Sequence, residues 1–224
     1  HYTISMLKLE KITKLYKKDD QEIYALNDFS LLIDKGDFIA IQGPSGCGKT
    51  TLLLTAGGLL QQEKGEVFIN GHSIYNLSTE KRALFRAQNI GFVFQQYHLI
   101  PYLSIIENIK VPALAQKTKI DDNKISELIE MLGLDKRINH TPAELSAGEK
   151  QRTALARALL FNPAVLLADE ITGNLDEVNV EIVMNCLTEY KNSGGTILLV
   201  THDKDLGIKA DKLINIKNGK RIFD

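Results

Sequence analysis

A glycine-rich stretch that follows a short apolar run has the residue types and spacing needed to hold phosphate. It fits the pattern G-x-x-x-x-G-K-[ST] with Gly43, Pro44, Ser45, Gly46, Cys47, Gly48, Lys49 and Thr50, and Thr51 follows. Glycines let successive backbone N–H groups turn toward phosphate oxygens, and a helix that begins here adds partial positive charge. We expect Lys49 to contact the β- and γ-phosphates and the Thr50 hydroxyl to ligate Mg²⁺. A glycine turn can also be a plain strand-to-helix loop, but every motif position is filled in the right context. The stretch therefore predicts a nucleoside triphosphate site.

A pair of carboxylates, Asp169 and Glu170, follows the buried apolar run 165–168. Phosphoryl transfer to water requires neutralised charge and a water molecule aligned with the γ-phosphorus. We expect Asp169 to hold Mg²⁺ and Glu170 to act as general base toward that water. Adjacent carboxylates at a strand end also occur as solvated turn residues, so the interpretation depends on the phosphate loop. We expect the pair to lie one strand away from that loop.

Three further side chains are candidates because each ends a predicted strand. His202 lies past the apolar run 196–200, and strand order would bring it beside Glu170 and the γ-phosphate. Gln95 ends another apolar strand, where its amide would reach Mg²⁺ or the attacking water. Tyr16 is a candidate for stacking on the base. Each also has a purely structural interpretation, as a strand-end polar group or a half-buried core residue.

Apolar periodicity and turn residues predict the elements that position these residues. Strands are expected at 6–16 as an edge strand, and at 29–33, 38–41, 66–69, 90–94, 165–168 and 196–200, with a last hairpin over 212–223. Asn70-Gly71 and Asn218-Gly219 are expected to be the turns of hairpins. Capping-box spacings begin helices at Ser104 and Ser146. Because residues 97–160 contain only helical patterns, we expect an inserted helical subdomain there.

Composition limits the function classes. The 27 basic and 28 acidic residues give a net charge of −1, which argues against nucleic acid as the main partner. The apolar stretches are too short to cross a bilayer. The two cysteines are far apart in sequence, and Cys47 lies inside the phosphate loop, which favours a reducing, cytoplasmic setting. Residues 1–5 precede a natural start at Met6 and are interpreted as a cloning remnant.

The order of these motifs resembles that of ATP-binding-cassette ATPases. The matching stretches are 43–50 (Walker A), Gln95 (Q-loop), 145–149 (signature), 165–170 (Walker B), 174–176 (D-loop) and His202 (H-loop). The resemblance covers the chain from Met6 onward. The stretches 92–95, 99–101 and 172–176 look most like the group of lipoprotein-releasing, macrolide-exporter and cell-division ATPases.

The resemblance implies an α/β fold: a RecA-like P-loop NTPase core with an antiparallel β portion and an inserted helical subdomain. A single nucleotide-binding domain would span 6–224, with 6–95 and 161–224 as core and 96–160 as helical subdomain. It also implies a head-to-tail dimer with a second copy of the chain, in which Ser146 and Gly148 complete the partner's ATP site. Asp176 would be the D-loop aspartate and Tyr16 the base-stacking aromatic.

Three residues depart from the family pattern. Ala147 and Glu149 stand where the signature usually has glycine and glutamine, and Ile171 stands where proline usually follows the Walker B glutamate. The Ala147 methyl would loosen the ATP sandwich if its position needs a positive φ. Because Ile171 replaces a proline, the stiffness of the D-loop is open to question. The catalytic carboxylate before it is intact.

The resulting expectation is an ATPase that binds ATP and Mg²⁺, dimerises on ATP and drives integral membrane permease subunits. The segment 97–109 would dock the membrane subunit, which would make the chain a peripheral protein on the inner face of the cell membrane. An alternative is an ATP-dependent regulator of a cell-envelope or cell-division complex without transport. A DNA-repair cassette is disfavoured because the chain has no room for a coiled-coil or zinc-binding insertion.

Overall fold

The computed structural model describes residues 5–18, 21–116, 118–173, 175–203, 207 and 209–222. Its strands form two sheets. One is antiparallel, with order β2-β1-β4-β5, and the other has six strands in the order β10-β9-β3-β8-β7-β6. The mixture of an antiparallel sheet, a mainly parallel sheet and packed helices is the α/β fold predicted from the sequence.

The antiparallel sheet contains β1 (Ser5–Lys18), β2 (Gln21–Asp34), β4 (Lys64–Ile69) and β5 (His72–Ser73). The prediction that the first strand lies at an edge is wrong, because β1 pairs with β2 on one side and β4 on the other. Lys11 and Lys17 of β1 are exposed, whereas Lys14 is largely covered where it pairs with Glu63. An interior strand with one solvent-facing side can show the same alternation as an edge strand. β2 also begins well before the predicted strand at 29–33. Asn70 and Gly71, between β4 and β5, both have positive φ, as a type I′ turn requires.

The second sheet holds the buried strands. β3 (Phe38–Gln42), β6 (Ile90–Val93), β7 (Val165–Asp169), β8 (Thr196–Val200) and β9 (Lys212–Lys217) run parallel. β10 (Lys220–Ile222) pairs antiparallel with β9, which gives the predicted hairpin, although Phe223 lies outside the described residues. Every residue of β7 and β8 is buried, as expected for strands covered on both faces.

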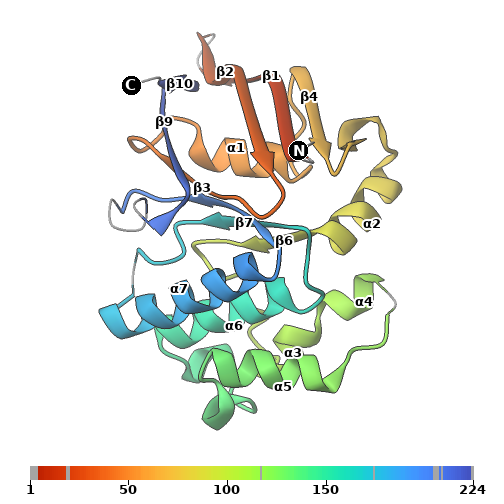
Figure 1. Ribbon diagram of the computed structural model, residues 1–224, viewed down its shortest axis with the longest axis vertical. Coiled ribbons are helices and arrows are strands. Elements are labelled where there is room, and N and C mark those ends of the chain that lie inside the picture. The colour runs from red at the N-terminus through yellow and green to blue at the C-terminus, as the bar shows by residue number, and fades with distance from the viewer. Residues whose placement is uncertain are drawn as a thin grey trace.

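Helices cover both faces of the parallel sheet (Figure 1). α1 (Lys49–Ala56) lies between the two sheets, where it contacts β1, β2, β7 and β8. On the opposite side lie α6 (Ala147–Leu159) and α7 (Glu177–Asn192). α2 (Thr79–Asn89), with Ser78 as its N-cap, contacts the strand β6, and the 3₁₀ turn η1 (Ile74–Asn76) contacts β4 and α2.

The described residues between β6 and β7 contain helices joined by irregular loops, and no strand. They include α3 (Ile105–Lys110), α4 (Pro112–Gln116), α5 (Asp122–Met131), the 3₁₀ turns η2 (Asp135–Arg137) and η3 (Pro142–Glu144), and α6. Both predicted capping boxes are formed, at Ser104 and at Ser146, and Thr141 forms a third. α3 ends just before Pro112, where the missing N–H cannot continue the first helix.

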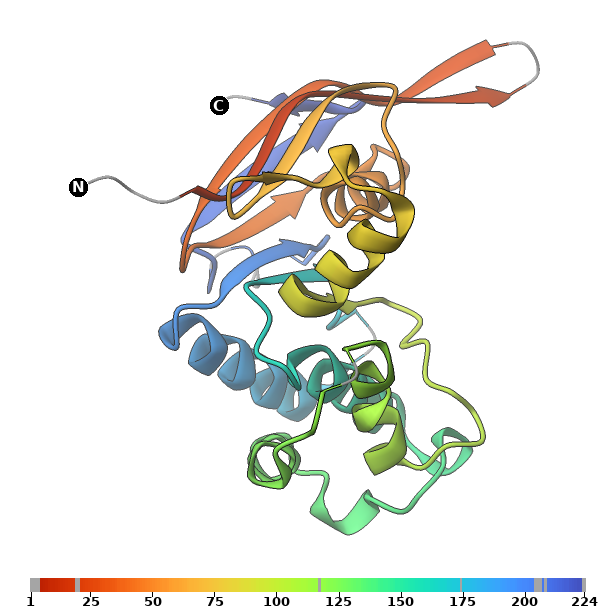
Figure 2. The same cartoon turned by 90° about the vertical axis from the view of Figure 1, so that its right-hand side faces the viewer.

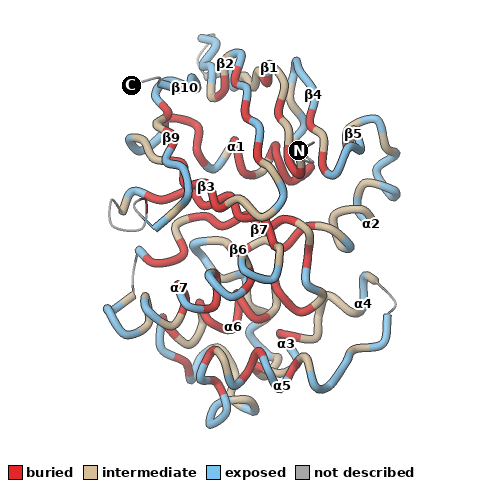
Figure 3. The backbone as a smooth tube through the Cα atoms, in the orientation of Figure 1, coloured by how far each residue is buried: buried red, intermediate tan, exposed pale blue. Residues whose placement is uncertain are grey.

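Two hydrophobic clusters lie on opposite faces of the parallel sheet. Ile39 and Ile41 point toward the cluster shared with α1 and the antiparallel sheet. Phe38 points toward the cluster shared with α6, α7 and the helical segment. This alternation follows from the period of two along a strand. Figure 3 shows the resulting band of buried residues through the middle of the molecule. None of the described helices is both long enough and apolar enough to cross a bilayer.

Candidate nucleotide-binding site

The candidate residues gather at the carboxyl ends of four neighbouring parallel strands. The phosphate loop follows β3, His202 follows β8, Asp169 ends β7 with Glu170 directly after it, and Gln95 lies just past β6. The expectation that the carboxylates lie one strand from the loop is wrong, because β8 separates β3 from β7. Helix α1, which follows the phosphate loop, spans the intervening strand because it contacts both β8 and β7. Side chains at the start of α1 therefore reach the carboxylates.

The phosphate loop has a backbone that requires glycine. Gly46 has φ +75° and Gly48 has φ +108°. A Cβ on Gly48 would lie 2.0 Å from the carbonyl oxygen of Ala25 in β2, so this position also needs glycine for space. Gly48 is the N-cap of α1 and supplies no side-chain cap. The N–H groups of the first turn of α1 are thus available to an anion.

Lys49 is held over the loop by its own backbone. Its Nζ donates to the carbonyl oxygens of Gly43 at 2.8 Å and Pro44 at 3.0 Å, and the residue is only 7% exposed. Two neutral acceptors leave the positive charge of the ammonium group uncompensated. A phosphate in the loop would provide the missing negative charge.

Thr50 and Asp169 form a pair that joins α1 to β7. The Thr50 hydroxyl donates to Oδ2 of Asp169 at 2.9 Å. Burial raises the pKa of Asp169, and the charge of Glu170 raises it further, while the Thr50 hydrogen bond and Lys49 act in the opposite direction. A nearby divalent cation would favour the ionised carboxylate, so these oxygens suit Mg²⁺.

Glu170 is held by side chains from two other strand ends. Its Oε1 lies 3.2 Å from Nδ1 of His202, and its Oε2 accepts a hydrogen bond from Nε2 of Gln95 at 3.3 Å. Glu170 has φ +48°, a left-handed conformation that is uncommon for a residue other than glycine. Its N–H donates to the carbonyl of Val200 in β8 at 2.9 Å, which fixes this conformation. Such strain concentrates at functional sites.

Most of these residues line one cavity of about 490 Å³, which is within the usual size of a small-molecule site. The lining residues are Tyr16, Ile23, Ala25, Ser45, Gly46, Gly48, Lys49, Thr50, Thr51, Gln95, Asp169 and Glu170. His202 is not part of this lining and instead lines a separate cavity. Sequence reasoning missed Ile23 and Ala25, because the first half of β2 was not predicted as a strand. The pairing of Tyr16 with Ile23 in the β1–β2 hairpin brings them to the cavity.

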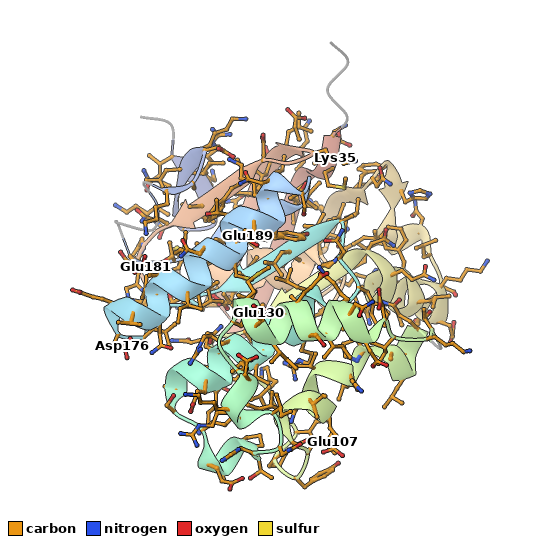
Figure 4. The ribbon with its side chains drawn as sticks, turned by 60° about the horizontal axis from the view of Figure 1, so that its bottom comes forward. Lys35, Glu107, Glu130, Asp176, Glu181 and Glu189 are labelled. Atoms are coloured by element: carbon orange, nitrogen blue, oxygen red, sulfur yellow. The ribbon has the colours of Figure 1, made fainter. Side chains whose placement is uncertain are left out.

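Three predicted site residues lie elsewhere. Ser146 is exposed at the start of α6, and neither it, Gly148 nor Asp176 lines the cavity. Asp176 accepts a hydrogen bond from the N–H of Asn179 and caps α7, at whose N-terminal end Figure 4 shows it. A Cβ on Gly148 would lie 2.3 Å from Oδ1 of Asn179, so the starts of α6 and α7 are packed together. Asn174, part of the predicted D-loop, lies outside the described residues.

The structure shows the surroundings of the three residues that depart from the family pattern. Ala147 is the first residue of α6 and does not have a positive φ, so its methyl group imposes no backbone strain. Ile171 is 1% exposed and belongs to the hydrophobic core beneath the site. Glu149 completes the capping box of Ser146 and pairs with Arg137 at 3.0 Å.

A strand, a glycine loop and a helix facing carboxylates from a nearby parallel strand define a P-loop ATPase. The family profile described as ABC transporter matches residues 26–173, and the chain belongs to this family. It is thus an ATPase of the ABC type, as the sequence motifs indicate.

Relatives and solved structures agree with this assignment. The lipoprotein-releasing system ATP-binding protein LolD of Francisella tularensis is 41% identical, over 96% of this chain and 95% of its own length. The macrolide export ATP-binding/permease protein MacB of Chlorobium phaeobacteroides is 40% identical over 98% of this chain, which spans only 34% of MacB. A dimeric, post-hydrolysis structure of the cassette MJ0796 bound to ADP and Pi superposes with a TM-score of 0.92, at 36% identity and 97% coverage of both chains.

Proposed function

We propose that the cavity at the strand ends binds ATP with Mg²⁺ and that Glu170 directs water onto the γ-phosphate. The observation that carries this proposal is the convergence on Glu170 of His202 and Gln95, beside a phosphate loop joined to Asp169 through Thr50. Tyr16, on the β1–β2 hairpin, lines the same cavity and is suited to stacking on the base. His202 and Gln95 hold the Glu170 carboxylate in a fixed position for its role as general base.

The donor set suits Mg²⁺, which prefers oxygen ligands and usually takes one or two carboxylates together with phosphate oxygens. Thr50 and Asp169 would hold the ion, with the Gln95 amide oxygen as a further ligand. Bound there, Mg²⁺ would neutralise charge on the phosphates. Lys49 contributes a second positive charge from the loop, and the free N–H groups at the start of α1 contribute partial charges.

We further propose that a second copy of the chain completes each ATP site. Ser146 and Gly148 lie at the start of α6, and Asp176 caps α7 beside it. Ser146 and Asp176 are exposed and Gly148 is buried, and all three lie away from the cavity of their own chain. A helix N-terminus presented to a γ-phosphate is an anion site. Support comes from the MJ0796 cassettes, which are dimeric.

The coupling partner that we propose is an integral membrane permease, in an exporter or lipoprotein-release system. LolD and MacB, which match this chain at 41% and 40% identity, carry these activities in their names. The permease part of MacB lies in the length that this chain does not cover. The chain would then act on the inner face of the cell membrane, bound through the permease.

The proposed docking segment 97–109 lies beside a groove between the core and the helical segment. This groove has a volume of about 460 Å³ and includes Phe92, Phe94, His98, Val111, Pro112 and Phe161 in its lining. Arg157 of α6 donates to the carbonyl oxygens of His98 and Tyr97, both at 2.6 Å. One end of α6 thus holds the segment after Gln95, and the other end carries Ser146. A partner in the groove would act on both at once.

The proposed roles are tested with two substitutions in the ATP site. Glu170→Gln should retain ATP binding but lose at least about a hundredfold in turnover, because general-base catalysis is removed. Lys49→Ala should instead lose ATP binding, because the buried ammonium group is the main full positive charge in the loop. ATPase rates and calorimetric ATP titrations measure both. A Glu170→Gln protein that turns over at the parental rate would remove this residue from the base role.

The partner proposal has its own test. The chain is co-expressed with membrane proteins encoded in its gene neighbourhood and purified in detergent. We expect a stable complex that Phe94→Glu, in the groove, disrupts while ATP binding is retained. A complex that forms equally well with Phe94→Glu would place the contact elsewhere.

A further inference from the structure

Three capping boxes occur in the helical segment, and one of them differs from the other two. In the boxes of Ser104 and Thr141, the hydroxyl donates its hydrogen to the glutamate three residues later, at 2.7 and 2.8 Å. In the box of Ser146, the hydroxyl accepts from the N–H of Glu149 at 3.2 Å, and the Ser146 N–H donates to Glu149 at 2.8 Å. No hydrogen bond from the Ser146 hydroxyl to the Glu149 carboxylate is formed within this described segment.

The difference coincides with a contact that only the third box has. Oε1 of Glu149 accepts a hydrogen bond from Nε of Arg137 at 3.0 Å, while Oε2 caps the Ser146 N–H. The pKa of Glu149 is lowered first by the Ser146 N–H, with the nearby hydroxyl and Arg137 adding to the effect, so the carboxylate is ionised at neutral pH. Each of the two carboxylate oxygens thus has a hydrogen-bond donor other than the Ser146 hydroxyl.

The backbone around Arg137 is held in place by hydrogen bonds to the start of α3. Arg137 ends η2, and the residues after it are tied to the start of α3. The carbonyl of His140 accepts the N–H of Ile105 at 2.9 Å, and the carbonyl of Ile138 accepts the N–H of Ile106 at 3.1 Å. The guanidinium also lies 3.3 Å from Nε2 of His140. The side chain of Glu149 is 16% exposed, so its charge is only partly screened by water.

We propose that Arg137 is a positioning residue for the ATP site of the second copy. It neutralises the Glu149 carboxylate, so that the start of α6 can receive a γ-phosphate. This inference rests on the proposed dimer. An unpaired carboxylate at the third residue of α6 would offset the partial positive charge of the helix N-terminus and repel the phosphate. Glutamine at position 149 would need no such partner.

The test measures ATP-dependent dimerisation by light scattering, with every variant made in the Glu170→Gln protein. Arg137→Ala should raise the ATP concentration for half-maximal dimer about tenfold, the effect of losing one charge-assisted hydrogen bond. Adding Glu149→Gln to Arg137→Ala should return the ATP concentration for half-maximal dimer to within about threefold of the parental value. Arg137→Lys keeps the charge and should give an intermediate value. The thermal midpoint should change little, because the Arg137 side chain is 46% exposed and an ion pair with such a partner contributes little to stability.

Glu144→Gln, in the neighbouring capping box, is the matched control and should leave dimerisation unchanged. If the Glu170→Gln parent forms no dimer with ATP, the proposed dimer fails and this inference fails with it. If the parent dimerises and Arg137→Ala does so at the same ATP concentration, only the role of Arg137 is overturned. If Arg137→Ala dimerises less well and adding Glu149→Gln does not restore dimerisation, the proposed role of Arg137 is also overturned. That result would show that Arg137 only supports the loop.

Discussion

Among the individual residues of the site, Glu170 is the one whose carboxylate and backbone conformation matter most for the proposed chemistry. Its backbone is left-handed, with φ +48°, and its carboxylate contacts side chains from the ends of β6 and β8. The strain is maintained by the hydrogen bond of its N–H to Val200 in the neighbouring strand. A side chain that is fixed in this way loses little freedom when it orients a water molecule, which favours catalysis.

The two glycines of the phosphate loop with positive φ should respond differently to alanine. Gly46→Ala should cost about 1 kcal/mol, because a left-handed alanine is strained but nothing lies within 4 Å of the new methyl group. Gly48→Ala should cost about 3 kcal/mol or more and abolish ATP binding, because the methyl group collides with the Ala25 carbonyl in β2. Urea denaturation and ATP titration measure both effects. Equal losses in the two variants would contradict the close packing of the loop against β2.

At the scale of elements, the β1–β2 hairpin extends beyond the rest of the molecule (Figure 2) and carries Tyr16. Glu63 holds β1 just before this extension: it accepts hydrogen bonds from Lys14 Nζ and the Leu15 N–H, both at 2.8 Å, and its own N–H donates to Thr13. Lys14 in turn lies 5.8 Å from the centre of the Tyr16 ring. The loop after α1 therefore helps to orient the base-stacking side chain.

Glu63→Ala should destabilise the protein by about 1 kcal/mol, because the Leu15 N–H loses its acceptor and Lys14 loses its partner. It should also raise the KM for ATP several-fold with little change in kcat, because Tyr16 is less well oriented. Denaturant titration and steady-state kinetics measure these effects. Glu10→Ala is the control on the same strand, since Glu10 pairs only with Lys8 on an exposed face, and should change neither quantity appreciably. A change in kcat alone would count against the proposed orientation of Tyr16.

The whole molecule is a sheet between two hydrophobic clusters, with the site where the clusters and the strand ends meet. Seven carboxylates around this core are stabilised in their ionised form. Folding lowers the pKa of Glu63, Glu80, Glu107, Glu144, Glu149, Asp176 and Asp211. Hydrogen bonds are the leading cause for five of them. For Glu63 and Asp211, burial raises the pKa, and bonds from Lys14 and Lys191 outweigh it.

Stability should therefore fall in acid. A carboxylate with a lowered pKa contributes stability above its ordinary value of 4.5 for Glu or 3.8 for Asp, and that contribution is lost as the pH falls below it. Asp169, with its raised pKa, acts in the opposite direction, but it is one group against seven. We expect a nearly constant free energy of unfolding from pH 7 to about pH 5.5 and a steady decline below about pH 4.5. Denaturant titrations across this range check the prediction, and increasing stability toward acid would refute it.

The local features of this protein could be predicted from its residues alone. The phosphate loop, the caps at Ser104 and Ser146 and the turn at Asn70-Gly71 depend on residues a few positions apart, whose conformations are set by short-range sterics and hydrogen bonds. The acidic pair after β7 and the ABC family were also predictable, because their motifs are contiguous.

The way these local features come together depends on long-range packing. Strand order placed β8 between the loop and the carboxylates, made β1 an interior strand and brought Ile23 and Ala25 to the cavity. It also joined Arg137 to Glu149, twelve residues away and across a turn. These contacts depend on which strands and loops pair over long separations. Local propensity does not specify that pairing, because it is selected by burial of the two hydrophobic clusters as a whole.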